Sequence, residues 1–161
     1  MALDAGLGLH TTGRAGVCFR SIEAEIFADL VREIEELLAA TSGDSGTTVS
    51  RHDDSLGFSW IVIADPDIDD LATTTHVVSQ SLEERGFSEQ LLCAVFGFDG
   101  APGALELVYA YKRGAFYPFA PRENPKRDGM LERRVQSVLA SELAFESELE
   151  RWYPVWDAPV T

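Results

Sequence analysis

The stretch Phe58-Ser-Trp-Ile-Val-Ile-Ala64 decides the fold of this chain. Successive side chains of an extended strand point to opposite faces, so Trp60 lies on one face and Ile61 on the other. A strand that is apolar on both faces belongs inside a sheet, or in a sheet that is covered on both sides. The preceding run 53–57, Asp-Asp-Ser-Leu-Gly, is rich in turn-forming residues and predicts a hairpin with a partner strand over 47–52.

Two amphipathic helices are predicted on either side of this hairpin. Residues 65–67, Asp-Pro-Asp, end the strand, because proline and acidic residues favour the first turn of a helix. The apolar residues that follow recur at three- and four-residue steps until Gly86, which predicts a helix with a glycine cap. An earlier helix is predicted from an N-cap at Ser21 to about Ala40. The apolar stripes are Ile22, Ile26, Leu30, Ile34 and Leu37/Leu38 in the earlier helix, and Ile68, Leu71, Thr75, Val78 and Leu82 in the later one.

Further strands are predicted over 16–20, 90–98 and 104–112, and a last helix from about Leu131 to near Trp152. The element order is then β-α-β-β-α-β-β-α. This order favours an α+β fold, with three helices packed on a largely antiparallel sheet, over a doubly wound parallel fold. Because no internal repeat or domain linker interrupts the chain, we expect one domain over 1–161.

Composition excludes several classes of function. The chain has 161 residues, 45% of them apolar, and a formal net charge of -14. Such an acidic protein repels phosphate backbones and anionic lipids, which argues against binding to nucleic acid or to membranes. The longest uncharged apolar stretches, 56–64 and 91–98, are far shorter than the ~20 residues that cross a bilayer. The N-terminus lacks the features of a secretory signal, so we expect a cytoplasmic protein.

The cationic residues have an unusual composition. Lys112 and Lys126 are the only lysines among 13 cationic side chains, and the other cations are arginines. An acidic surface with few lysines is typical of proteins that stay soluble in concentrated salt, where screening relieves carboxylate repulsion. We therefore expect a halophilic protein. A GC-rich genome, which favours arginine, alanine and glycine codons, explains the same composition.

Familiar cofactor and metal motifs are missing from the sequence. Asp65, Asp67 and Asp69 resemble the start of a calcium loop, but Asp70 stands where that loop requires glycine. No phosphate-binding glycine loop, dinucleotide fingerprint or nucleophile elbow occurs. We therefore expect no cofactor, no metal and no catalytic residue.

Scattered reactive side chains leave one alternative open. Cys18 and Cys93 belong to neither a CxxC motif nor a Cys/His cluster, so we expect two small buried hydrophobes rather than a disulfide or a metal site. His52 and His76 fall on different predicted elements. A hydrolase with a site assembled around these histidines and the acidic pair 53–54 is the enzymatic alternative to the expectation that the protein is no enzyme.

The segment 109–121, YAYKRGAFYPFAP, is the densest cluster of aromatic and cationic residues in the chain. Glycine bends a chain and proline removes a hydrogen-bond donor, so this segment is predicted to leave the sheet as an extended arm. Aromatic residues and arginine are enriched in protein interfaces, although aromatic residues also serve as packing anchors. The predicted partner-binding residues are Lys112, Arg113, Phe116, Tyr117 and Phe119.

Five stretches give the sequence a resemblance to the family of PspA-associated proteins called PspAB. The matching stretches are 13–20, 57–60, 82–87 with 91–93, 111–121 and 151–156, of which the last two are the most specific. The resemblance implies a non-enzymatic accessory protein of the phage-shock or membrane-stress response. It implies as partners the coiled-coil protein PspA and an HtpX-like membrane metalloprotease, which would place the protein at the membrane surface through a partner. It also implies a further N-terminal segment ahead of the position of Leu3.

Two other interpretations stay beside this one. The predicted element order is similar to secretion-chaperone-like and YbjN-like α+β domains, which bind other proteins across a sheet or groove. A self-associating, chaperone-like module, with an exposed strand edge or aromatic arm that forms a homodimer, is therefore an alternative to binding a membrane-stress partner.

Overall fold

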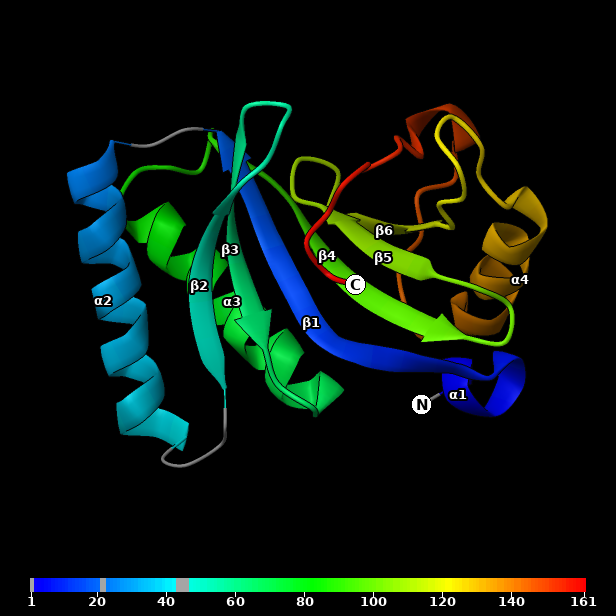
Figure 1. Ribbon diagram of the computed structural model, residues 1–161, viewed down its shortest axis with the longest axis horizontal. Coiled ribbons are helices and arrows are strands. Elements are labelled where there is room, and N and C mark those ends of the chain that lie inside the picture. The colour runs from blue at the N-terminus through cyan, green and yellow to red at the C-terminus, as the bar shows by residue number, and fades with distance from the viewer. Residues whose placement is uncertain (1, 21–22, 43–46) are drawn as a thin grey trace.

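The computed structural model describes residues 2–20, 23–42 and 47–161, which form a six-stranded antiparallel sheet with helices packed on it (Figure 1). The α+β class and the antiparallel sheet are therefore as predicted. The strands follow the spatial order β2-β3-β1-β4-β5-β6. The elements are α1 (Ala2–Leu7), β1 (Leu9–Arg20), α2 (Ala24–Ser42), β2 (Thr48–Asp53), β3 (Phe58–Ala64), α3 (Ile68–Glu84), β4 (Leu91–Gly100), β5 (Leu105–Ala110), β6 (Ala115–Phe119), α4 (Gly129–Leu139) and the 3-10 helix η1 (Leu149–Arg151).

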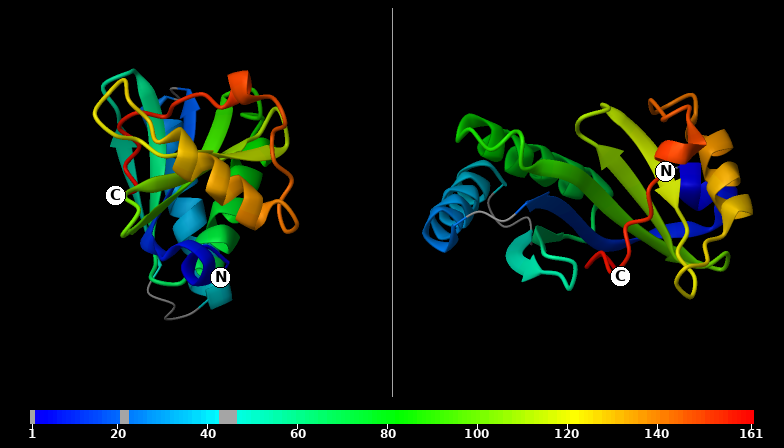
Figure 2. Two further views of the ribbon diagram at one scale, coloured as in Figure 1. Left: turned by 90° about the vertical axis from the view of Figure 1, so that its right-hand side faces the viewer. Right: turned by 90° about the horizontal axis from the view of Figure 1, so that it is seen from above.

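Both faces of the sheet are covered, but by different kinds of structure. α3 lies behind the sheet in Figure 1, and the C-terminal residues cross in front of it. The view from above in Figure 2 shows the same two layers on opposite sides of the strands. The larger core, on the helix side, includes Leu30 of α2, Val78 of α3 and Val135 of α4. The smaller core joins the sheet to the C-terminal residues, among them Trp152 and Val160.

Strand β3 confirms the pattern read from its sequence. It pairs with β1 on one side and β2 on the other, and so lies inside the sheet. Ile61 and Ile63 are fully buried in the helix-side core, while Trp60 is buried in the core beneath the C-terminal residues. Its apolar residues are thus buried on both faces, as alternation along a covered strand requires.

The predicted caps of α3 are confirmed, whereas the predicted N-cap of α2 cannot be compared with the structure. The Asp67 side chain accepts a hydrogen bond from the Asp69 backbone N–H at the start of α3. Gly86, with a φ of 85°, follows the end of this helix and adopts the left-handed conformation that glycine tolerates best. The predicted N-cap Ser21 lies outside the described residues.

Strand β1 is longer than the predicted strand 16–20. Its first half, from Leu9, pairs with the far end of β4, where Leu9 is opposite Gly100. The pairing is irregular between Thr11 and Ala15, and Gly13 adopts a φ of 77° inside that irregularity. Polar residues and a glycine in this half hide the apolar alternation from which strands are predicted.

The segment expected to leave the sheet as an arm is instead the edge strand β6. It pairs with β5, and Phe119 is fully buried. Its outer edge is also covered: the Phe116 N–H donates to the Ala144 carbonyl, and the Glu146 N–H donates to the Phe116 carbonyl. An edge strand tolerates proline, so Pro118 does not prevent this pairing.

The last helix is shorter than predicted. α4 is capped by Asp128, whose side chain accepts from the Leu131 N–H, and it ends at Leu139 rather than near Trp152. Beyond it the chain turns back to β6, and the Trp152 indole donates to the Glu146 carbonyl at 2.9 Å. Contacts with a distant strand therefore override the helical spacing of the apolar residues in this region.

Candidate functional site

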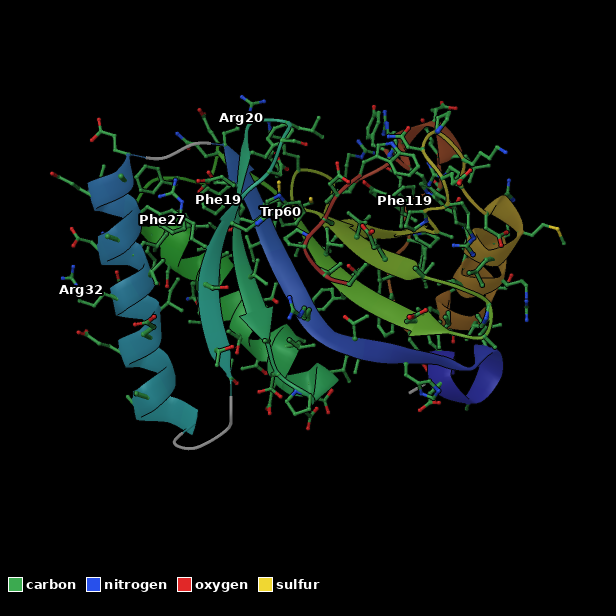
Figure 3. The ribbon with its side chains drawn as sticks, viewed as in Figure 1. Phe19, Arg20, Phe27, Arg32, Trp60 and Phe119 are labelled. Carbon is green, nitrogen blue, oxygen red and sulfur yellow. The ribbon has the colours of Figure 1, made fainter. Side chains whose placement is uncertain are left out.

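A pocket of about 500 Å³ opens between the turn that joins β2 to β3 and the C-terminal residues. Its volume lies within the range of about 300–1,000 Å³ that is common for ligand sites. Large apolar side chains form most of the wall, including Trp60, Tyr117 and Trp156, while Arg113 and Arg151 are its cationic members. Figure 3 shows Trp60 on the β3 side and Phe119 on the β6 side of this face of the sheet.

The Trp60 ring lies directly against β1 because residue 16 is glycine and has no side chain. A Cβ atom at Gly16 would come within 2.7 Å of the Trp60 ring, closer than such atoms approach in proteins. The Trp60 indole N–H donates to Asp54 at 2.9 Å, and the Leu56 and Phe58 backbone N–H groups donate to the same carboxylate. Burial opposes ionisation of Asp54, but these hydrogen bonds outweigh it and lower its pKa. The carboxylate thus anchors this wall.

The opposite wall is anchored by the C-terminal residues. The Tyr117 hydroxyl donates to the Tyr153 carbonyl at 2.8 Å, which ties β6 to the chain that crosses above it. The Trp156 ring packs edge-on against Phe119, with 4.9 Å between ring centroids. Because Tyr117 is buried, its pKa is raised well above the ordinary value, and the hydroxyl stays protonated as a donor.

Two arginines on the pocket wall share one carboxylate. Arg113 Nε lies 2.7 Å from Glu146 Oε1, and Arg151 Nη1 lies 3.8 Å from the same oxygen. The Glu146 side chain is only 6% exposed, whereas that of Arg113 is 49% exposed. The hydrogen bond from Arg113 is the main reason that the pKa of Glu146 is lowered. Among the described residues, no group accepts a hydrogen bond from the terminal guanidinium nitrogens of Arg113, which can therefore bind an external anion.

The predicted partner-binding residues do not share one surface. Arg113 and Tyr117 line the pocket, and Lys112 is exposed in the turn between β5 and β6. Phe116 points to the other face and lines a second cavity of about 370 Å³ beside α3. Phe119 is fully buried, so it contacts no partner in this conformation.

The structure separates the two histidines of the enzymatic alternative. His52 is opposite Trp60 in the β2–β3 pairing, which places it on the side of the sheet that the C-terminal residues cover. His76 lies on α3, on the helix-covered side, and lines the second cavity. Within residues 2–20, 23–42 and 47–161, no group of three or more His, Cys, Asp and Glu side chains is placed to hold a metal ion.

Sequence analysis missed two features beneath the C-terminal residues. Glu106 is only 4% exposed, and its Oε1 has no hydrogen-bond partner in the described part of the chain. Burial raises its pKa to about 8. Cys18 and Cys93 face each other on β1 and β4 and line the pocket together. The sequence did contain a signal for the buried carboxyl group, because Glu106 stands between two leucines in the predicted strand 104–112. The pairing of the two cysteines depends on strand register, which cannot be read from the sequence.

Comparison with known proteins identifies a family. No helix in the described ranges combines the length and apolar character needed to cross a bilayer. No match was found among curated proteins or among solved structures. The family model described as PspAB, PspA associated protein B, matches residues 1–160. This match covers nearly the whole chain, and it includes the β6 segment and the C-terminal residues that build the pocket. The chain therefore belongs to the PspAB family of PspA-associated proteins.

Proposed function

We propose that this protein is a non-enzymatic accessory protein of the phage-shock or membrane-stress response, and that it acts by binding PspA through the pocket. The family description supplies the partner, because it names PspA. The observation that carries the proposal is the open aromatic pocket with half-exposed arginines on its wall, in a chain whose formal net charge is -14.

The composition of the pocket suits a protein partner. Tryptophan, tyrosine and arginine are the residues most enriched in the energetic centres of protein interfaces, and Trp60, Tyr153 and Arg113 all line this pocket. A large apolar side chain of the partner would fill the aromatic part. Acidic residues beside it would bind the free nitrogens of Arg113, and a coiled-coil protein presents such combinations along its helices.

The exposed Lys112 extends the cationic region outward from Arg113. Two adjacent cations on an acidic protein attract an acidic partner surface and orient it toward the pocket during encounter. This contribution acts mainly on the association rate and weakens in salt. Burial of the apolar side chain would then determine the lifetime of the complex.

The test measures the affinity of the purified chain for PspA from the same organism by calorimetry. Leu56 and Tyr153 line the pocket and are 60% and 65% exposed, so Leu56→Asp and Tyr153→Ala change the pocket with little effect on folding. Met130, on α4 and outside the pocket lining, is 80% exposed, and Met130→Ala is the matched control. We expect each pocket variant to bind at least about tenfold more weakly, and the control to bind normally.

Two outcomes would contradict the proposal. Equal affinities for the pocket variants and the control would remove the pocket from the interface. If the wild-type chain binds no PspA but captures an HtpX-like protease, that protease replaces PspA as the partner. If it binds no PspA but forms a dimer in light scattering, the partner is a second copy of the chain. Arg113 is a poor choice for substitution, because its loss would remove the shortest hydrogen bond to the buried Glu146 carboxylate.

A further inference from the structure

We propose that Cys18 and Cys93 form a redox-active dithiol that a peroxide converts into a disulfide between β1 and β4. They are the only cysteines in the chain, and 75 positions separate them in sequence. The fold nevertheless places them directly opposite each other on neighbouring antiparallel strands. Both are free, and both line the pocket. Directly opposed residues of an antiparallel pair share one face of the sheet, so the two thiols lie side by side in the reduced protein.

The local backbone allows the small movement that a disulfide requires. Directly opposed residues of an antiparallel pair have Cβ atoms about 4.5–5.5 Å apart, whereas a disulfide needs about 3.8 Å. The strands must therefore approach by roughly 1 Å at this point. The β1–β4 register shifts between Cys18 and Phe19, so regular pairing is interrupted next to the first cysteine. Such an irregularity lets one strand adjust without moving the whole ladder.

The pair adjoins a pocket that is open to solvent. Cys18 and Cys93 line the pocket of about 500 Å³, although Cys18 itself is only 4% exposed. Cys93 is the more exposed of the two and is therefore the first to react. The pocket is much larger than hydrogen peroxide, so no opening of the fold is needed. This placement distinguishes the pair from two cysteines that only fill a core.

The reaction balances with hydrogen peroxide as the two-electron oxidant. The Cys93 thiolate attacks one peroxide oxygen, the O–O bond breaks, and Cys93 sulfenic acid and water form once the leaving hydroxide is protonated. The Cys18 sulfur then attacks the sulfenic sulfur, the S–O bond breaks, and a second water leaves. In total two thiols lose two electrons and two protons, and one peroxide becomes two waters.

The surroundings make this oxidation slow rather than immediate. The neighbouring Cys18 thiol, and after it burial, raise the pKa of the Cys93 thiol well above its ordinary value. Because the thiolate is the reactive form, only a small fraction of the protein reacts at a given moment at neutral pH. The pair thus stays reduced in a reducing cytoplasm and responds to sustained exposure. A change in PspA affinity after oxidation would follow only if the proposed function holds; the thiol chemistry is independent of it.

The experiment treats the folded chain with hydrogen peroxide, and separately with the thiol oxidant diamide, and then blocks free thiols with iodoacetamide. Before oxidation we expect slow alkylation of Cys93, the more exposed cysteine, in the folded chain, and alkylation of both cysteines after denaturation. After oxidation we expect none, an intact monomer lighter by two hydrogens, and a peptide that links Cys18 to Cys93. In the Cys18→Ser variant, dimedone should instead trap a sulfenic acid on Cys93.

Denatured wild-type protein under the same oxidants is the control that the reagents work. If the folded chain keeps two alkylatable thiols while the denatured chain is cross-linked, the geometry does not support the disulfide and the proposal is wrong. Over-oxidation of Cys93 without a link to Cys18, or a disulfide only between two chains, would also overturn it. None of these outcomes bears on PspA binding, so failure here leaves the proposed function to its own test.

Discussion

Replacing Glu106 with glutamine should remove a large part of the pH dependence of folding. Glu106 lies on β5 between Gly97 of β4 and Phe119 of β6, on the face that the C-terminal residues cover. It is 4% exposed, and burial raises its pKa from 4.5 to about 8. A buried carboxyl group without a partner prefers its neutral form, because the interior solvates the charge poorly.

The direction and size of the effect follow from this shift. Between pH 4.5 and about 8 the folded protein keeps a proton that the unfolded chain releases, so the stability that Glu106 contributes is full below pH 4.5 and is lost as pH rises through 8. At about 1.4 kcal/mol per pH unit the whole loss is on the order of 5 kcal/mol, of which about 3 kcal/mol has occurred by pH 7. Glutamine has nearly the same shape and does not titrate.

The assay is urea unfolding of the wild type and Glu106→Gln at several pH values from 5 to 9, followed by tryptophan fluorescence at constant salt. The difference between the two unfolding free energies should shift in favour of the variant by several kcal/mol over this range. Glu123→Gln, at an exposed glutamate, is the control and should keep a constant offset. Parallel pH profiles for the wild type and Glu106→Gln would refute the assignment of a buried neutral carboxyl group.

Two further predictions concern the C-terminal residues and the acidic surface. A Cβ atom at Gly97 would overlap the Val160 carbonyl oxygen, so Gly97→Ala should lower the free energy of unfolding by about 1–3 kcal/mol in urea, whereas Gly129→Ala, in open space at the start of α4, should not lower it. An equal effect of both substitutions would show that the close approach at Gly97 does not matter. The thermal midpoint should rise from dilute buffer to molar KCl, because salt screens the repulsion among 27 acidic side chains; a constant midpoint would reject the halophilic interpretation.

The elements that sequence analysis predicted well carry their signal within a few residues. The stretch Phe58–Ala64 alternates apolar residues on both faces, and the start of α3 has an aspartate cap at Asp67. Both depend on local spacing and local hydrogen bonds, which hold in almost any fold. The sheet class followed from the order of such elements.

The features that sequence analysis did not predict depend on distant partners. β6 contains a proline and reads as irregular, yet Ala144 and Glu146 form hydrogen bonds with the backbone of Phe116 at its outer edge. The pocket draws its walls from β1, β3, β4, β5, β6, the β2–β3 and β5–β6 turns and the C-terminal residues, so no short window of sequence contains it. Cys18 and Cys93 are opposite each other because of the register of the β1–β4 pairing, which contains irregularities. The spacing of apolar residues in the sequence does not predict such a register.

The pocket exists because the second face of the sheet is covered by a chain without regular structure. On the first face the helices bury their apolar stripes in the larger core. On the second face two glycines permit close approach: Gly16 lets the Trp60 ring lie against β1, and Gly97 lets the Val160 carbonyl reach β4, where the Thr12 hydroxyl donates to it at 2.6 Å. The C-terminal residues are thereby fixed at the middle of the sheet and again at β6 by the Tyr117 hydroxyl, while the space toward the β2–β3 turn is left open. Because the C-terminal residues are held at a few points rather than along their length, a pocket stays open between those points, as the proposed binding of a partner requires.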